Sequence, residues 1–301
     1  MTLPFQQTLL HSVDCVGIGL HSGNTIRMTL HPSAVDTGVV FVRRDVKNKN
    51  PRVAANYMNV SNTMLGTTLS NEEGVSVATV EHLMAAFWGC GIDNAIVELD
   101  GPEIPVMDGS SEPFVFLIEC AGIKKQHKHR RMVEVLKKVE VSEDNKRVAI
   151  MPASSFTVSL EIDFNDRIIS HQTCVFDSSD VSFKTDLCRA RTFCFENEVD
   201  VMRSKGLALG GSLDNAIVVG KEGVINEGGL RYRDEFVRHK VLDCIGDFNL
   251  TGGAYLLGRL HGFRSGHAIN NKLLRTFFAD KDAWRIVEAP VEVTLTTVGN
   301  A

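Results

Sequence analysis

The chain has 301 residues, of which 44% are hydrophobic and 23% are charged, and its formal net charge is -5. This length and composition indicate a globular protein with room for two domains of about 150 residues. The acidic balance argues against nucleic-acid binding, which depends on lysine and arginine side chains that neutralise phosphates. No apolar run approaches the roughly 20 residues of a membrane helix, and the N-terminus lacks a basic segment followed by an apolar core, so we expect at most peripheral membrane contact.

The cysteines point to a reducing environment. There are seven, without a C-x-x-C pair, which fits neither a disulfide framework nor a zinc ribbon. We therefore expect free thiols and a cytoplasmic location. Separately, we expect the protein to be a monomer.

Short segments with β-type patterns extend from the N-terminus to about Thr68. Thr25 to Leu30 and Val39 to Arg44 alternate or run apolar between glycine and proline turns, which predicts strands. The glycine-rich segment Gly17 to Gly23 lacks G-x-G-x-x-G spacing, and no helical pattern follows it. It predicts a tight turn rather than a dinucleotide site.

A helix is predicted from Thr79 to Gly91, TVEHLMAAFWGCG. Thr79 is suited to cap its N-terminus, an apolar stripe runs along it, and glycines end it. Glu81 and His82 interrupt this apolar sequence, and burying them without partners would cost several kcal/mol. They either lie on an exposed rim or belong to a hydrolytic metal site, with His82 as a ligand and Glu81 as the base on water.

The second half of the chain repeats the order of the first. A strand at Asp93 to Leu99 and a helix from about Glu112 to Ala121 are followed by the basic run Lys124 to Arg131. This run could contact phosphate or anionic lipid, but we interpret it as a solvated interdomain linker. Strands resume beyond it, a helix is predicted within Glu198 to Leu209, and the string DNAIV of Asp93 returns at Asp214. This order indicates an internal duplication.

The segment Asp234 to Asp247, DEFVRHKVLDCIGD, predicts a helix with a broad apolar face. Four ionisable residues recur every four positions and so share one stripe of it: Glu235, His239, Asp243 and Asp247. His239 and Asp243 could hold a zinc ion together, with a third ligand from elsewhere and one position left for water. The alternative is a solvated polar face, which is common on such helices.

A last helix is predicted after FRSGHAINNK, Phe263 to Lys272. His267 would lie at its N-terminus, where the helix dipole disfavours imidazolium unless a carboxylate such as Asp247 compensates. The alternative is a histidine that only caps a turn.

These elements predict an α+β fold of two duplicated domains, each a sheet layered with helices, with the site between them. The site residues would come from both domains: Glu81 and His82 from residues 1–126, and His239, Asp243 and His267 from residues 131–301.

Six segments spread over nearly the whole chain carry a family resemblance: VEHLMAA, IDNAIVELDGPEIPVMDGSS, RARTF, LGGSLDNAIVV, DEFVRHKVLDCIGD and SGHAINNK. Together they resemble the zinc-dependent UDP-3-O-acyl-N-acetylglucosamine deacetylases of lipid A biosynthesis. The resemblance implies the duplicated α+β fold, zinc as cofactor, and removal of the N-acetyl group from an acylated UDP-sugar. It also implies a set of zinc ligands: His82, His239 and Asp243.

The same resemblance implies roles for other residues. Glu81 would be the general base. His267, paired with Asp247, would be the acid or electrostatic partner, and Thr192 would help stabilise the oxyanion.

Substrate contacts are implied as well. Lys240 and Phe193 would help bind the substrate, and the segment from Val199 to Val218 would form a passage for the acyl chain. Within that segment, the small residues Ala208 and Ser212 leave room that larger side chains would fill.

Two classes of function remain open from the residues alone. One is the deacetylase, and the other is a non-catalytic nucleotide-sugar-binding module with a structural metal. Structural zinc sites usually have four protein ligands, with cysteine well represented. The set of two histidines, one aspartate and an adjacent glutamate therefore favours the enzyme.

Overall fold

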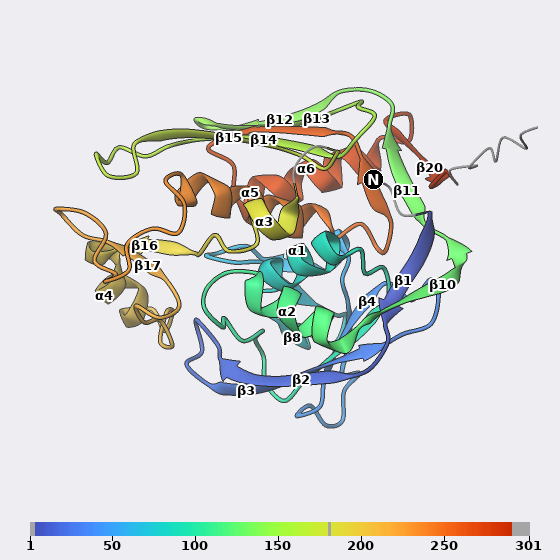
Figure 1. Ribbon diagram of the computed structural model, residues 1–301, viewed down its shortest axis with the longest axis horizontal. Helices are drawn as coiled ribbons and strands as arrows, with labels where there is room; N and C mark the ends of the chain where they lie inside the picture. The colour runs from blue at the N-terminus through green and yellow to red at the C-terminus, as the bar shows by residue number, and fades with distance from the viewer. Residues whose placement is uncertain (1–3, 180–181, 291–301) are drawn as a thin grey trace, which may run out of the picture.

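Within residues 4–179 and 182–290, which the computed structural model describes, two five-stranded β-sheets enclose a double layer of helices (Figure 1). The strands of the first sheet are β2 (Val13–Ile18), β3 (Thr25–Pro32), β4 (Val39–Arg43), β5 (Arg52–Ala54) and β9 (Ala95–Leu99). Those of the second sheet are β12 (Val139–Glu143), β13 (Lys146–Met151), β14 (Thr157–Asp163), β15 (His171–Asp177) and β19 (Arg259–Phe263).

The two sheets have the same topology. Their strand orders are β2-β3-β9-β4-β5 and β12-β13-β19-β14-β15. In each sheet the third and fourth strands pair in parallel, whereas the other neighbours are antiparallel. The predicted duplication and α+β class are confirmed by this match.

The DNAIV string was the wrong marker of the repeat. The first copy forms β9, whose topological counterpart is β19. The second copy contributes to β17 (Ile217–Val219), which pairs with β16 (Phe193–Phe195) in a separate two-stranded sheet. The order of the elements, rather than the string, carried the signal.

The inner faces of the sheets pack against the helices. In β3, Ile26, Met28 and Leu30 are buried, while Thr25 and Arg27 are exposed, the period of two expected for a sheet with one covered face. The enclosed helices are α1 (Glu81–Cys90), α2 (Glu112–Ala121), α5 (Glu235–Phe248) and α6 (His267–Ala279). Helix α5 packs on both α1 and α6, so the first and second halves meet through helices.

A glycine permits the close approach of α1 to α5. A Cβ atom added at Gly246 would lie 2.1 Å from the carbonyl oxygen of Glu81, far inside van der Waals contact. Because backbone cannot move aside as a flexible side chain does, only glycine fits at this crossing. Glu81 immediately precedes His82, so this crossing also sets the distance between His82 on α1 and the polar side chains of α5.

The prediction of a solvated linker at Lys124 to Arg131 is wrong. Residues 123–129 form β10 (Ile123–His129), which pairs antiparallel with β1 (Phe5–Leu9). Arg130 is buried and donates to Asp93 through Nε at 2.8 Å and Nη2 at 2.7 Å. The lysines of β10 are exposed, but the segment is tied to the first half by a sheet and a buried ion pair.

The cap predicted at Thr79 is also wrong. Helix α1 has no side-chain cap, and Thr79, with φ of 59°, donates its hydroxyl to Glu103 at 3.0 Å.

The remaining described elements include two three-stranded sheets, β6-β7-β8 and β18-β11-β20. Their bounds and those of the other short elements are η1 (Tyr57–Asn59), β6 (Val60–Asn62), β7 (Thr68–Ser70), β8 (Ser76–Val77), β11 (Arg131–Val135), α3 (Phe183–Asp186), α4 (Glu196–Ser204), β18 (Tyr255–Leu257) and β20 (Trp284–Glu288). All seven cysteines are free thiols, as predicted. Among the described residues, every helix is too short or too polar to span a lipid bilayer.

Candidate active site

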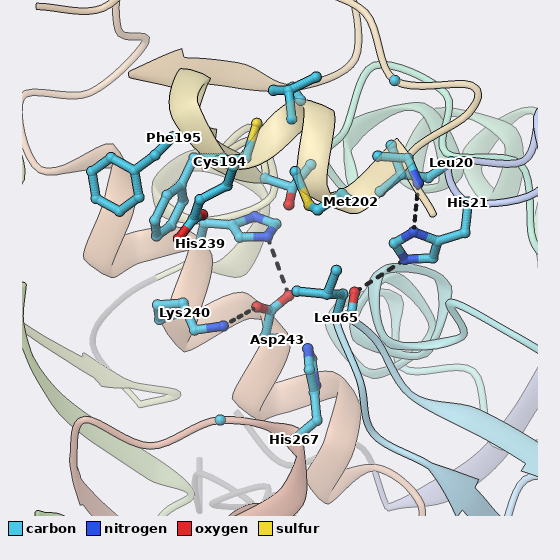
Figure 2. Close-up of a pocket in the computed structure, with 18 of the residues that line it drawn as sticks. Leu20, His21, Leu65, Cys194, Phe195, Met202, His239, Lys240, Asp243 and His267 are labelled. Atoms are coloured by element: carbon cyan, nitrogen blue, oxygen red, sulfur yellow. Dashed lines mark hydrogen bonds and ion pairs between the residues drawn. The ribbon is translucent and has the colours of Figure 1, made fainter. Parts of the chain in front are cut away.

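Three ligand-type side chains meet where α1 faces α5. His82 is the second residue of α1, and His239 and Asp243 lie one turn apart on α5. Asp243 Oδ1 lies 3.3 Å from His239 Nε2 and 3.5 Å from His82 Nε2, and one ligand atom from each residue lies within 4.8 Å of the others. The close-up in Figure 2 shows His239 directed at Asp243 from the same helix.

The geometry of this group fits a zinc ion. Ligand atoms about 2.0–2.1 Å from a tetrahedral zinc are about 3.3–3.4 Å apart, close to the separations between Asp243 and the two histidines. Asp243 Oδ1 is buried and has no hydrogen-bond partner among the described residues, which is unusual for a buried carboxylate oxygen. A cation between the three side chains would satisfy this oxygen and both imidazole nitrogens.

The His239 ring is prepared to bind a metal. Its Nδ1 lies 3.0 Å from the carbonyl oxygen of Ala190, which only accepts, so Nδ1 carries the hydrogen and Nε2 keeps a lone pair. Burial lowers the pKa of His239 to about 3. The ring is therefore neutral at physiological pH, the form that coordinates metals.

The polar stripe of α5 is buried along its whole length, which excludes a solvated face: Glu235, His239, Asp243 and Asp247. Its members have different partners. Glu235 accepts hydrogen bonds from the Arg191 guanidinium and backbone nitrogen at 2.9 and 3.0 Å, so it takes no part in the metal group. Arg191 follows Ala190, and this pair thereby fixes the segment whose carbonyl holds His239.

Glu81 begins α1 beside His82 and reaches the same space. It is 3% exposed, so the exposed-rim alternative is wrong. Its Oε2 accepts a hydrogen bond from the backbone nitrogen of Thr67 at 2.9 Å, and its Oε1 lies 3.8 Å from His267 Nε2. Burial raises the pKa of Glu81, which makes the carboxylate a stronger proton acceptor than an ordinary glutamate.

His267 is the first residue of α6, and its Nδ1 lies 2.9 Å from Asp247 Oδ2. Burial alone would lower the pKa of His267, but the Asp247 and Glu81 carboxylates outweigh it and raise the pKa to about 9. The carboxylate thus compensates the helix N-terminus, and His267 is an imidazolium at neutral pH. It does more than cap a turn.

A cavity of about 830 Å³ opens onto these groups (Figure 2). Lys240 lines it and donates to Asp243 Oδ2 at 2.8 Å. Burial would lower the pKa of Lys240, but Asp243 raises it, so the ammonium stays charged. Thr192 and Phe193 form part of the wall, and the Phe193 ring packs edge-on against His239 with centroids 6.3 Å apart.

The segment predicted to hold the acyl chain lines the same cavity, through Val199, Ala208, Ser212 and Val218. His21 also lines the cavity and contacts this segment. Its Nδ1 lies 3.4 Å from the Ala208 backbone nitrogen, and its Nε2 lies 3.2 Å from the Leu65 carbonyl oxygen. Of the predicted site residues, all line the cavity except Asp247, which lies behind His267.

Several polar and aromatic residues near the site were not predicted from the sequence. Thr67 and Asn270 bond to Asp247 at 2.6 and 2.9 Å, and Lys146 and Phe164 line the cavity. Single residues in strands and loops have no spacing that marks them, and their partners are distant in sequence. Only Asn270 had an available signal, because it lies one turn after His267 on the same helix.

Comparisons with known proteins agree with this geometry. The family model described as "LpxC: UDP-3-O-acyl N-acetylglycosamine deacetylase" matches residues 6–279. The chain is also 49% identical over 284 residues to the UDP-3-O-acyl-N-acetylglucosamine deacetylase of Chromohalobacter salexigens, covering 94% of this chain and 93% of that protein. Both matches include the helices that carry the buried metal-ligand group. The resemblance seen in the motifs is confirmed, and the chain belongs to the UDP-3-O-acyl-N-acetylglucosamine deacetylase family.

Proposed function

We propose that His82, His239 and Asp243 form the zinc centre of this enzyme. We also propose that the side chains around them transfer protons, stabilise the oxyanion and bind the substrate during deacetylation. The chain is a zinc-dependent amidohydrolase of lipid A biosynthesis, which hydrolyses the N-acetyl group of UDP-3-O-acyl-N-acetylglucosamine and releases acetate. One observation carries the assignment of the centre: the buried, unpartnered oxygen of Asp243 faces two histidine nitrogens beside Glu81.

Glu81 is the proposed general base. When bound, zinc polarises the amide carbonyl and makes water more acidic. Glu81 accepts the proton of the attacking water. Its Oε2 is held by the Thr67 backbone N–H, which leaves Oε1 free to do this.

His267 is the proposed acid. Its Nδ1 is held by Asp247, so Nε2 is free to give a proton to the leaving nitrogen. The Nε2 atom lies 3.8 Å from Glu81 Oε1, and both groups therefore reach one reacting centre. Thr192, on the cavity wall, donates its hydroxyl hydrogen to the developing oxyanion.

Lys240 and Phe193 are the proposed substrate contacts. The hydrogen bond from Lys240 to Asp243, a proposed zinc ligand, holds the ammonium group beside the zinc centre. There the ammonium favours binding of a negatively charged or polar part of the substrate. Phe193 offers an apolar ring that packs against His239 and lines the same cavity as the acyl segment.

The acyl chain is proposed to lie along Val199, Ala208, Ser212 and Val218. These residues share one cavity with the zinc centre, and the cavity volume is within the range usual for small-molecule sites. The apolar members favour a hydrocarbon chain, because each methylene removed from water contributes about 0.8 kcal/mol.

We further propose that residues 1–126 and 131–301 are separate domains and that the enzyme works as a cytoplasmic monomer. The repeated sheet topology supports the division. The monomer is supported by a site whose proposed residues all come from a single chain. Free thiols support a reducing compartment.

Release of acetate distinguishes the enzyme from a binding module with a structural metal. Purified protein is incubated with UDP-3-O-acyl-N-acetylglucosamine, and acetate and the free amine are measured with and without a chelator. We expect equal amounts of both products, and none after chelation. Binding of the sugar nucleotide without acetate would support the binding module instead.

A further inference from the structure

Thr67 contacts both the proposed general base, Glu81, and the proposed acid pair, His267 and Asp247. It does not itself line the cavity. It immediately precedes β7 in the first half of the chain and is 2% exposed. Its hydroxyl oxygen lies 2.6 Å from Asp247 Oδ1 and 3.2 Å from His267 Nδ1. Its backbone nitrogen donates to Glu81 Oε2 at 2.9 Å. One buried residue thus touches the base and the acid pair.

The hydroxyl has one hydrogen, and its direction follows from its partners. The hydroxyl donates to Asp247 Oδ1, since a carboxylate oxygen accepts hydrogen bonds, so the hydroxyl hydrogen points to Asp247. The hydroxyl oxygen then presents lone pairs to the Nδ1–H of His267, whose hydrogen is directed mainly at Asp247 Oδ2, so both contacts are consistent with a hydrogen on Nδ1. This arrangement leaves Nε2 as the nitrogen that faces Glu81 and the cavity.

Asp247 is held from both of its oxygens. Thr67 donates to Oδ1, and Asn270 donates to Oδ2 at 2.9 Å. Without the hydroxyl, the carboxylate would lose the contact that keeps its plane directed at the His267 ring. The backbone N–H of Thr67 would still hold Glu81, because a side-chain substitution leaves it in place.

We propose that Thr67 is a positioning residue for the deacetylation reaction. Its hydroxyl orients the Asp247 and His267 pair, and its backbone N–H selects Oε1 of Glu81 as the oxygen free for proton transfer. This inference rests on the proposed function, since it requires His267 to take part in the reaction. Because Thr67 lies outside the cavity wall, its hydroxyl acts on the chemical step and leaves substrate binding unchanged.

The test compares Thr67→Val, which replaces the hydroxyl with a methyl of similar size, with Thr67→Ser, which keeps it. For Thr67→Val we expect kcat to fall about 10- to 100-fold, the range for losing a hydrogen bond that orients a group at a metal centre. KM and bound zinc should stay within about twofold of wild type. Thr67→Ser should keep kcat within about threefold. Thr68→Val is the matched control, because the neighbouring Thr68 makes none of these contacts, and its kcat should not change.

A double-mutant cycle separates positioning from a general loss of structure. If Thr67 acts through His267, Thr67→Val should have little further effect in a His267→Ala background. The proposal would be overturned if the fold-loss in kcat of the double variant equalled the product of the two single losses. An unchanged kcat in folded Thr67→Val would also overturn it. If Thr67→Val does not fold, Thr67→Ala is measured against the same outcomes. Wild type and Thr68→Val report separately on the proposed function, which fails if neither releases acetate.

Discussion

At the scale of single residues, the site divides into groups that hold the metal and groups that move protons. Glu81→Ala should keep its fold and about one zinc per chain but lose at least about 100-fold in activity, because the base acts on water rather than on the ion. His239→Ala should lose the metal itself. Elemental analysis and acetate release measure both effects. Full zinc occupancy in His239→Ala would remove His239 from the ligand set, and an unchanged rate in Glu81→Ala would leave Glu81 a structural residue.

The charge of Asp247 should set the alkaline limb of activity. Although burial opposes it, Asp247 raises the pKa of His267 to about 9, so the imidazolium predominates at neutral pH and is lost as the pH rises through that value. The profile of kcat/KM against pH should therefore fall on the alkaline side, with Glu81 or a coupled group on the acid side. Asp247→Asn should move the alkaline limb to lower pH. If both proteins share one alkaline limb, another group sets it.

At the scale of elements, the crossing of α1 and α5 brings the two halves of the site together. Gly246→Ala should destabilise the fold: the helix propensity of alanine contributes at most about 1 kcal/mol, whereas overpacking a tight contact costs about 1–3 kcal/mol. The clash is with the Glu81 backbone, so zinc affinity should fall too. Urea unfolding and zinc binding measure the two effects. Gly228→Ala is the control, because its added Cβ meets no atom within 4 Å; equal stability of both variants would contradict the tight crossing.

The segment after α4 should set the preferred acyl length. Ser212→Phe fills part of the cavity, and each methylene excluded from it forfeits about 0.8 kcal/mol, or roughly fourfold in kcat/KM. We choose Ser212 because Ala208 has a left-handed backbone with φ of 53°, where a larger side chain adds strain. The measurement is kcat/KM across substrates of different acyl length, and the preferred chain should be shorter. Ser204→Phe on the exposed side of α4 is the control; identical length profiles in both variants would remove this segment from the substrate site.

At the scale of the whole molecule, the elements that sequence predicted well are those with a strong period or a large motif. The helices at Glu81–Cys90 and Glu235–Phe248 were expected within one or two residues at their ends, because a 3.6-residue apolar period is a local signal. The side chains that the two helices were predicted to bring together do meet in one buried group that could hold a metal ion: His82, His239 and Asp243.

What sequence missed depends on contacts between distant segments. The basic run became β10 because β1, more than 100 residues earlier, offers a partner edge, and exposed lysines do not reveal that pairing. Thr67 is 180 residues from Asp247, so no spacing rule connects them. The repeated DNAIV string misled because identical letters occupy different sheets. Tertiary pairing, rather than local propensity, decided each of these cases.

We propose above that deacetylation requires one zinc ion held by residues from both halves of the chain. The most direct measurement is acetate release from UDP-3-O-acyl-N-acetylglucosamine while zinc is titrated into chelated wild-type, His82→Ala and His239→Ala proteins. We expect the wild type to be inactive without metal and to reach full activity at about one equivalent of zinc, and we expect either variant to stay inactive at that equivalent. Two results would contradict the requirement for this zinc centre. One is acetate release by the metal-free wild type, and the other is a wild-type rate in both variants at one equivalent of zinc.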